Sequence, residues 1–327
     1  MIMAKTRRGK IWVWVVVLIL VVITVAGLLN RDWIYDWYRG ISYKPEAEMV
    51  AIRDKLKLTG WGEFLFNAAQ PELNEASDFN VNCRQYESEV AVLGCYTTGN
   101  IYVYNITDAK LAGIRELTTA HELLHVVWAH MSESEKKELE PILQQVYRDN
   151  LDVLKNDIET YAEGERLEEM FVRAGTEIKQ LPAVLEKRYA EIFKDQDKVV
   201  DFYNSYIAVF REIKVHMEEL ASEIEVLKSE IDAKMLAYDA EVVALNADVT
   251  SFNSCAEIVG CFASEREFYA QRNTLIARET ALSVMSDEIS NLIDIYNAKV
   301  DEYNADAIES DKLQNIIDSK AGATEIK

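Results

Sequence analysis

Residues 118–128 read TTAHELLHVVW, and this stretch decides the fold because its two histidines are spaced for one face of a helix. Residues four apart in an α-helix lie on the same face, so the imidazoles of His121 and His125 can reach one metal ion. Glu122 lies one step round the helix, where its carboxylate can take a proton from a water molecule beside that ion. The leucines and valines of the stretch predict that the opposite face is buried.

The segment 121–125 resembles the HExxH signature of the zincin metallopeptidases, which lies on a central helix. The resemblance covers roughly residues 88–178, and the five-residue motif is its only highly specific part. The longer block 118–128 also looks like the catalytic helix of uncharacterised membrane-attached bacterial proteins of this type. The resemblance implies a peptidase with one Zn²⁺ per chain, bound by His121 and His125. It also implies that Glu122 is the general base in hydrolysis of a peptide or protein substrate.

A third zinc ligand does not follow directly after the motif. In zincins with a third histidine the motif continues as HExxHxxGxxH, whereas here Trp128 takes the glycine position and Met131 the last histidine position. His130 is one position off and lies about 140° round the helix from His125, so we interpret it as a non-ligand. Zincins commonly use a tyrosine or histidine to assist the oxyanion, and the candidates here are Tyr161, Tyr189 and His130.

The resemblance to the gluzincin branch of this group implies a glutamate ligand on a later helix. The segment 163–177, EGERLEEMFVRAGTE, offers several glutamates. We expect Glu169 to be the ligand, because residues 168–171 resemble the segment that bears it in some gluzincins. Glu165, one turn earlier on the same face, is the alternative. With Glu169 as the ligand, Arg173 takes the place of the aspartate that usually follows four residues later.

Two apolar runs before the motif predict a β-hairpin. EVAVLGCY (89–96) and IYVYNIT (101–107) are rich in β-branched and aromatic residues and flank a turn. In a zincin the strand at 101–104 would lie along the cleft edge, where an extended peptide can add as a further strand; a plain core strand is the alternative. Helices are expected over 108–130, from a Ser132–Glu135 capping box toward 147, over 155–174 with Gly175 ending it, and over 182–194.

Residues 11–29 (IWVWVVVLILVVITVAGLL) form an apolar run without a charge. A helix of this length at ~1.5 Å per residue spans roughly 28 Å, about the thickness of a bilayer core. The run predicts one transmembrane helix in contact with lipid, after a basic cytoplasmic tail at 1–10. The positive-inside rule then predicts a single-pass protein of the cell membrane, with the zincin-like domain (30–198) outside the cytoplasm. A cleaved signal peptide is the alternative.

The four cysteines form two pairs that are close in sequence. In an oxidising compartment the expected disulfides are Cys83–Cys95 and Cys255–Cys261. A metal site with cysteine ligands is the alternative, although neither pair has the C-x-x-C spacing that such sites often use.

Apolar residues recur at alternating spacings of three and four through most of 199–310, with one four-residue slip before Met235. This pattern predicts two long arms of an antiparallel coiled coil, closed at the tip by Cys255–Cys261. An ordinary helical bundle and pairing with a second chain are the alternatives. Residues 311–327 are expected to form a frayed tail.

The whole chain is therefore expected to be mostly α (α+β), with a transmembrane helix, a zincin-like domain with a small β-hairpin or sheet, and the long helical hairpin. Its net charge of −21 at pH 7 repels phosphate backbones and excludes nucleic acid as a partner. Two functions from different classes fit. One is a membrane-anchored zinc peptidase; the other is a surface interaction or structural coiled-coil protein, with a structural or vestigial zinc site and a protein partner on the hairpin.

Overall fold

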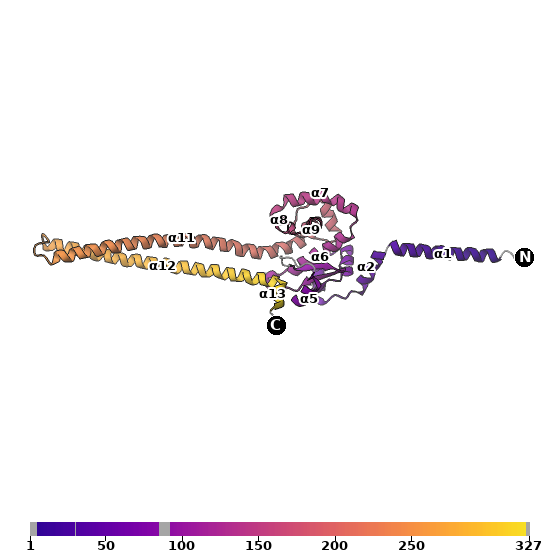
Figure 1. Cartoon of the computed structure of the whole chain (residues 1–327), viewed down its shortest axis with the longest axis horizontal. Helices are drawn as coiled ribbons and strands as arrows, with labels where there is room; N and C mark the ends of the chain where they lie inside the picture. The colour runs from indigo at the N-terminus through magenta and orange to yellow at the C-terminus, as the bar shows by residue number, and fades with distance from the viewer. Residues whose placement is uncertain (1–4, 30, 85–91, 325–327) are drawn as a thin grey trace. The chain divides into compact units, whose positions relative to one another are not determined.

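The structure is mostly helical, with one small three-stranded sheet and two long helices. It is a computed structural model that describes residues 5–29, 31–84 and 92–324 (Figure 1). The chain divides into two compact units. The first is Met1–Val209 together with Gln314–Lys327, and the second is Phe210–Leu313.

Short helices and three short strands precede the two long helices along the chain. In order, the elements are α1 (Lys5–Leu29), α2 (Arg31–Ser42), α3 (Ala47–Leu56), α4 (Gly60–Ala69), β1 (Glu72–Asn74), α5 (Ala76–Asn82), β2 (Gly94–Thr97), β3 (Asn100–Tyr104), the 3₁₀ helix η2 (Ala109–Leu111), α6 (Ile114–His130), α7 (Glu133–Asp149), α8 (Leu151–Ile158), α9 (Arg166–Glu177), α10 (Ala183–Ala190), α11 (Gln196–Ala256), α12 (Glu265–Ile317) and α13 (Ser319–Thr324).

The sheet has the strand order β1-β3-β2, with β2 antiparallel and β1 parallel to β3. The predicted hairpin of β2 and β3 is confirmed, except that residues 89–91 of its first run lie outside the described residues. The prediction for the strand at 101–104 is wrong in one respect. This strand, β3, is the central one, and β2 is the edge strand beside α6. β1 was not predicted, because three residues are too few to show a period of two.

Helix α6 carries the motif through the core of the first unit. Ala120, Leu123 and Leu124 are completely buried, because the apolar positions of the motif face inward while the histidines lie on the other side. The helix ends at His130, and Ser132 begins α7 with the predicted capping box: Ser132 Oγ accepts from Glu135 N, and Glu135 Oε2 accepts from Ser132 N. Local sequence therefore defines where α7 begins after α6.

Helix α9 packs against α6 and differs from its predicted form. The helix expected over 155–174 is broken into α8 and α9, and Gly175 lies inside α9 rather than ending it. A Cβ at Gly175 would lie 2.6 Å from Leu124 Cδ1 and 2.7 Å from Tyr189 Cε1. Glycine is therefore needed here for close packing of α9 on α6, and not for a left-handed helix cap.

The predicted membrane span over residues 11–29 is corrected. Helix α1 covers this segment, but the side chains of residues 5–11, 23 and 26–29 are outside the described set. Among the residues searched, no helix is both long enough and apolar enough to cross a membrane. The predicted transmembrane helix, its lipid contact and the single-pass location at the cell membrane are therefore not supported.

Both predicted disulfides are present. Cys83 joins Cys95, which ties the end of α5 to β2, and Cys255 joins Cys261 between the two long helices. Residues 311–327 are expected from the sequence to form a frayed tail, but 311–317 continue α12 and 319–324 form α13, while 325–327 lie outside the described residues. This last helix packs on α5, where Asn80 Nδ2 donates to Ser319 O at 2.9 Å and Ser319 Oγ donates to Asn80 Oδ1 at 2.7 Å.

Within the second unit, α11 and α12 lie side by side and run antiparallel (Figure 1). Ion pairs link the arms: Glu223 with Lys299 at 2.9 Å, Lys234 with Glu288 at 2.9 Å and Glu241 with Arg278 at 2.6 Å. Partner numbers fall on one arm as they rise on the other, which only an antiparallel pair gives.

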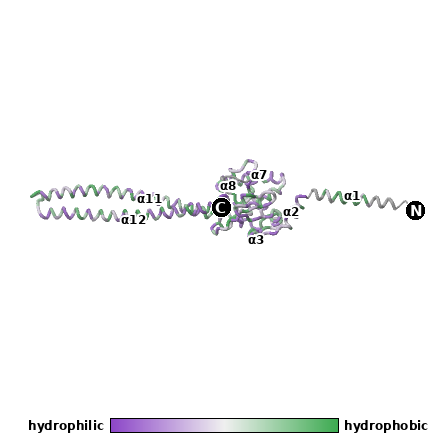
Figure 2. The backbone as a smooth tube through the Cα atoms, turned by 60° about the horizontal axis from the view of Figure 1, so that its bottom comes forward, coloured by the Kyte–Doolittle hydropathy of each residue, from purple (hydrophilic) through white to green (hydrophobic). Residues whose placement is uncertain are grey.

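Apolar residues recur along both arms of this hairpin (Figure 2). Most of those between the arms are half-buried, and Leu220, Ile231, Leu245 and Leu282 are buried. Two helices alone cannot cover all of their shared apolar stripe, so burial is limited to these positions and to Leu313 near the end of α12.

Candidate metal centre

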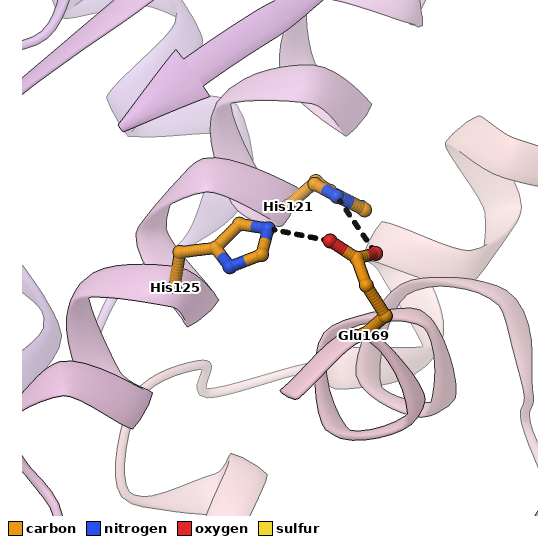
Figure 3. Close-up of side chains that lie close together, drawn as sticks. All are labelled: His121, His125 and Glu169. Atoms are coloured by element: carbon orange, nitrogen blue, oxygen red, sulfur yellow. Dashed lines mark ion pairs between the residues drawn. The ribbon is translucent and has the colours of Figure 1, made fainter. Parts of the chain in front are cut away.

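Three side chains predicted from the sequence as ligands come together between α6 and α9. The Nε2 atom of His125 lies 3.3 Å from Glu169 Oε1, and the Nε2 atom of His121 lies 3.9 Å from Glu169 Oε2. One ligand atom from each residue lies within 4.8 Å of the other two. Figure 3 shows both imidazoles turned toward the carboxylate of Glu169, which comes from the neighbouring helix. This group can hold a metal ion.

Two other residues weighed as ligands lie outside this group. Glu165 is exposed at the start of α9. His130 is engaged elsewhere: its Nε2 lies 2.8 Å from Asp36 Oδ2, and its Nδ1 lies 2.7 Å from the carbonyl oxygen of Val126. Of the residues weighed as the third ligand, Glu169 is the one that is both buried and directed at the two motif histidines.

The environment of Glu169 fits a bound cation. Its side chain is 6% exposed, and its Oε2 atom has no hydrogen-bond partner among the described residues. Arg173 Nε lies 3.5 Å from this oxygen, and Arg173 also donates from Nη1 to Glu177 at 2.8 Å. A buried carboxylate oxygen without a donor is costly, and a metal ion between Glu169 and the imidazoles would satisfy it.

The two imidazoles have opposite electrostatic environments. Burial lowers the pKa of His121 to about 3, although nearby Glu169 opposes this shift. For His125 burial also acts to lower the pKa, but its contacts with Glu168 and Glu169 outweigh burial and raise the pKa to about 10. His121 therefore has the neutral form that binds metal. His125 would lose a proton to solvent when a metal ion takes the place of that proton between the ring and Glu169.

Glu122 lies next to this group and is 5% exposed. Burial raises its pKa to about 7, an effect that His125 opposes. Its carboxylate accepts a hydrogen bond from the backbone N–H of Tyr96 in β2. A buried carboxyl group whose pKa is close to neutral is suited to take up and return a proton.

Of the three candidates for an oxyanion-assisting residue, one lies near the metal-binding group of His121, His125 and Glu169. The hydroxyl of Tyr189 is buried and donates to Phe171 O at 2.7 Å, and His130 is paired with Asp36. Tyr161 instead lies close to Glu169 and Arg173, and burial followed by the charge of Glu169 raises its pKa to about 12. Its phenol is therefore protonated and able to donate at neutral pH.

Glu168 is a site residue that the sequence did not indicate. Its Oε1 lies 2.7 Å from His125 Nδ1, which leaves Nε2 of the same ring directed at Glu169. A carboxylate on the far nitrogen of a ligating histidine fixes the ring and its tautomer. The adjacent pair Glu168-Glu169 was the available signal, but sequence alone cannot say which neighbouring residue faces which ring.

Replacing Glu168 by alanine is expected to weaken zinc binding by roughly 10–100-fold, because His125 loses the acceptor that orients its ring. Glu168→Gln should keep most of the affinity, since the amide oxygen still accepts from Nδ1–H. The measurement is competition with a chromogenic chelator. Glu163→Ala is a matched control, because Glu163 is exposed just before the same helix. Wild-type affinity in Glu168→Ala would show that Glu168 does not orient His125.

Comparison with known proteins finds no matching family model, no matching curated protein and no matching solved structure.

Proposed function

We propose that this chain is a zinc-dependent peptidase that hydrolyses peptide bonds in proteins or peptides. One observation carries the proposal. Two imidazole nitrogens from α6 and a buried carboxylate from α9 converge beside a second buried carboxylate, that of Glu122. The resemblance of residues 121–125 to the zincin motif supports the same reaction.

The donor set favours zinc over other common ions. Mg²⁺ and Ca²⁺ prefer oxygen ligands, whereas two imidazoles and one carboxylate are a frequent set for catalytic zinc. Structural zinc sites usually have four protein ligands. In the part of the chain that the structure describes, the group consists of His121, His125 and Glu169. Three protein ligands would leave one position of a tetrahedral ion for water.

The chemistry divides between the ion and Glu122. Bound zinc would supply Lewis acidity, lowering the pKa of a water molecule and polarising the scissile carbonyl. Glu122 takes the proton from the attacking water and later gives it to the leaving amine. Tyr161, with its protonated hydroxyl beside Arg173, is the residue placed to donate to the oxyanion that forms.

The strand beside Glu122 favours an extended peptide as substrate. Among the described strands, β2 pairs only with β3, so its second edge carries no strand. Tyr96 on that edge gives its N–H to Glu122, and a peptide in extended conformation can add along the rest of such an edge through main-chain hydrogen bonds. This supports a peptide rather than a compact small molecule.

Zinc removal is the direct test of this function. The purified chain should contain about one zinc per molecule and should cleave members of a mixture of defined peptides, detected by mass spectrometry. Treatment with a chelator should stop cleavage, and zinc should restore it. His125→Ala should bind no zinc and cleave no peptide. A wild-type chain that stays metal-free after zinc is added would contradict the proposal.

A second function is favoured by the tip of the hairpin. Ile258 and Val259 are 62% and 104% exposed on the turn closed by Cys255–Cys261. Exposed aliphatic side chains on a constrained turn suit contact with a protein partner. Zinc binding without cleavage of any peptide would favour this function, with the metal as a structural element.

A further inference from the structure

The edge strand β2 presents backbone groups to the general base. Tyr104 N donates to Leu93 O, so the backbone carbonyl of Leu93 points toward β3. Hydrogen-bonded and non-hydrogen-bonded positions alternate in an antiparallel pair. The backbone groups of Gly94 and Tyr96 therefore point away from β3, and Tyr96 uses its N–H to bind the Glu122 carboxylate.

Gly94 brings the strand into direct contact with the same carboxylate. A Cβ at this position would lie 2.8 Å from Glu122 Oε1 and 2.6 Å from Thr118 Cγ2. These distances are too short for any side chain, so only glycine allows β2 to lie this close to α6. The side chain of Glu122 thus packs against Gly94 of β2 and accepts a hydrogen bond from Tyr96 of the same strand.

Cys95 lies between these two residues and anchors the strand. Side chains alternate across a strand, and Cys95 is 2% exposed in a small apolar cluster with Phe79 and Cys83. Its disulfide to Cys83 ties β2 to the end of α5. The covalent bond therefore fixes β2 at the residue between the two that contact Glu122.

We propose that the Cys83–Cys95 disulfide and the Tyr96 amide position Glu122 for proton transfer, independently of metal binding. The inference rests on the proposed function of Glu122. The metal-binding group comes from α6 and α9, so loosening β2 leaves these ligands in place. Misplacing a catalytic group by about 1 Å can cost roughly 10²-fold in rate. Disturbing β2 therefore lowers kcat, while zinc affinity stays unchanged.

The first test removes a single hydrogen bond. Tyr96→Pro eliminates the N–H that binds Glu122, and proline is tolerated where an edge-strand N–H does not serve the ladder. We expect kcat to fall by about 10–100-fold, with zinc content and affinity as in the wild type. Tyr96→Phe keeps the amide, so its kcat should exceed that of Tyr96→Pro by about the same factor. Equal kcat in both variants, or loss of zinc in Tyr96→Pro, would overturn the proposal.

The second test removes the disulfide, with the other disulfide as a matched control. The double variant Cys83→Ala/Cys95→Ala should lose at least about 10-fold in kcat and keep zinc. Cys255→Ala/Cys261→Ala, at the hairpin tip, should match the wild type in both. A Cys83→Ala/Cys95→Ala chain with wild-type kcat would overturn the proposal.

A third measurement does not depend on activity or on correct folding of a cysteine variant. Hydrogen exchange of the Tyr96 amide in the metal-free chain should be slow, and Glu122→Ala should make it fast because the acceptor is gone. Fast exchange in the wild type would overturn the proposal. If the wild type cleaves no peptide but this exchange pattern is found, the contact between β2 and Glu122 stands and the proposed function fails.

Discussion

Replacing Glu122 by glutamine is expected to lower kcat for peptide hydrolysis by about 10²–10⁴-fold, while one zinc ion per chain remains bound. Glutamine has nearly the same size and can still accept the Tyr96 N–H, but it cannot take a proton from water. Because Glu122 is outside the group of converging ligand atoms, the metal should be unaffected. Steady-state kinetics on a fluorogenic peptide, with zinc measured on the same samples, separates the two effects.

Glu116→Gln is the matched control for this change. Glu116 is a buried carboxylate on the same helix, and it pairs with Lys55 Nζ at 2.6 Å, away from the histidines. Its replacement should reduce the free energy of unfolding and leave kcat unchanged. Peptide hydrolysis that survives Glu122→Gln at the wild-type rate would rule out the role assigned to Glu122.

Replacing Glu169 by glutamine should reduce zinc affinity by more than the 10–100-fold typical of residues that only orient a ligand, that is by at least about 100-fold. The change removes the anionic oxygens that face both imidazoles, while the side chain keeps its shape. Activity should be lost in the same proportion at limiting zinc. Isothermal titration of the metal-free chain with zinc gives the affinity.

Glu165→Gln provides the control. Glu165 lies one turn before Glu169 and is exposed, so its replacement should leave zinc affinity at the wild-type value. The reverse result, with zinc lost in Glu165→Gln and kept in Glu169→Gln, would mean that α9 rearranges when the metal binds and that Glu165 is the third ligand.

Features set by neighbours in the sequence could be predicted. The spacing of His121 and His125 places both rings on one face, and the Ser132–Glu135 capping box defines a helix start, because both depend on residues three or four apart. The disulfides and the heptad series of the hairpin follow from similarly local patterns. Even in the hairpin, one position of the predicted apolar series is not buried between the arms. Met235, after the slip, is 46% exposed, and Lys234 instead pairs across the arms.

Features set by contacts between distant segments could not be predicted. Gly175 looks like a helix end in sequence, and only the packing of Leu124 and Tyr189 against it shows why glycine is needed. The hydrogen bond from the Tyr96 backbone leaves no mark in the sequence, since every residue except proline has a backbone N–H group. Likewise, the role of Glu168 depends on which side of α9 faces His125. Tertiary packing decides each of these.

The pairing of α13 with α5 has a consequence for biosynthesis. Asn80 and Ser319 are 239 positions apart in the chain, and the second unit is made between them. Near the tip the arms contact each other across one short turn, as between Phe252 and Phe268, and such local pairings form faster than distant ones. An early hairpin would bring the flanking segments close together and shorten the effective loop that must close. The hairpin would then hold the two flanking segments together during folding. The first unit would be complete only after α13 has left the ribosome and packed on α5.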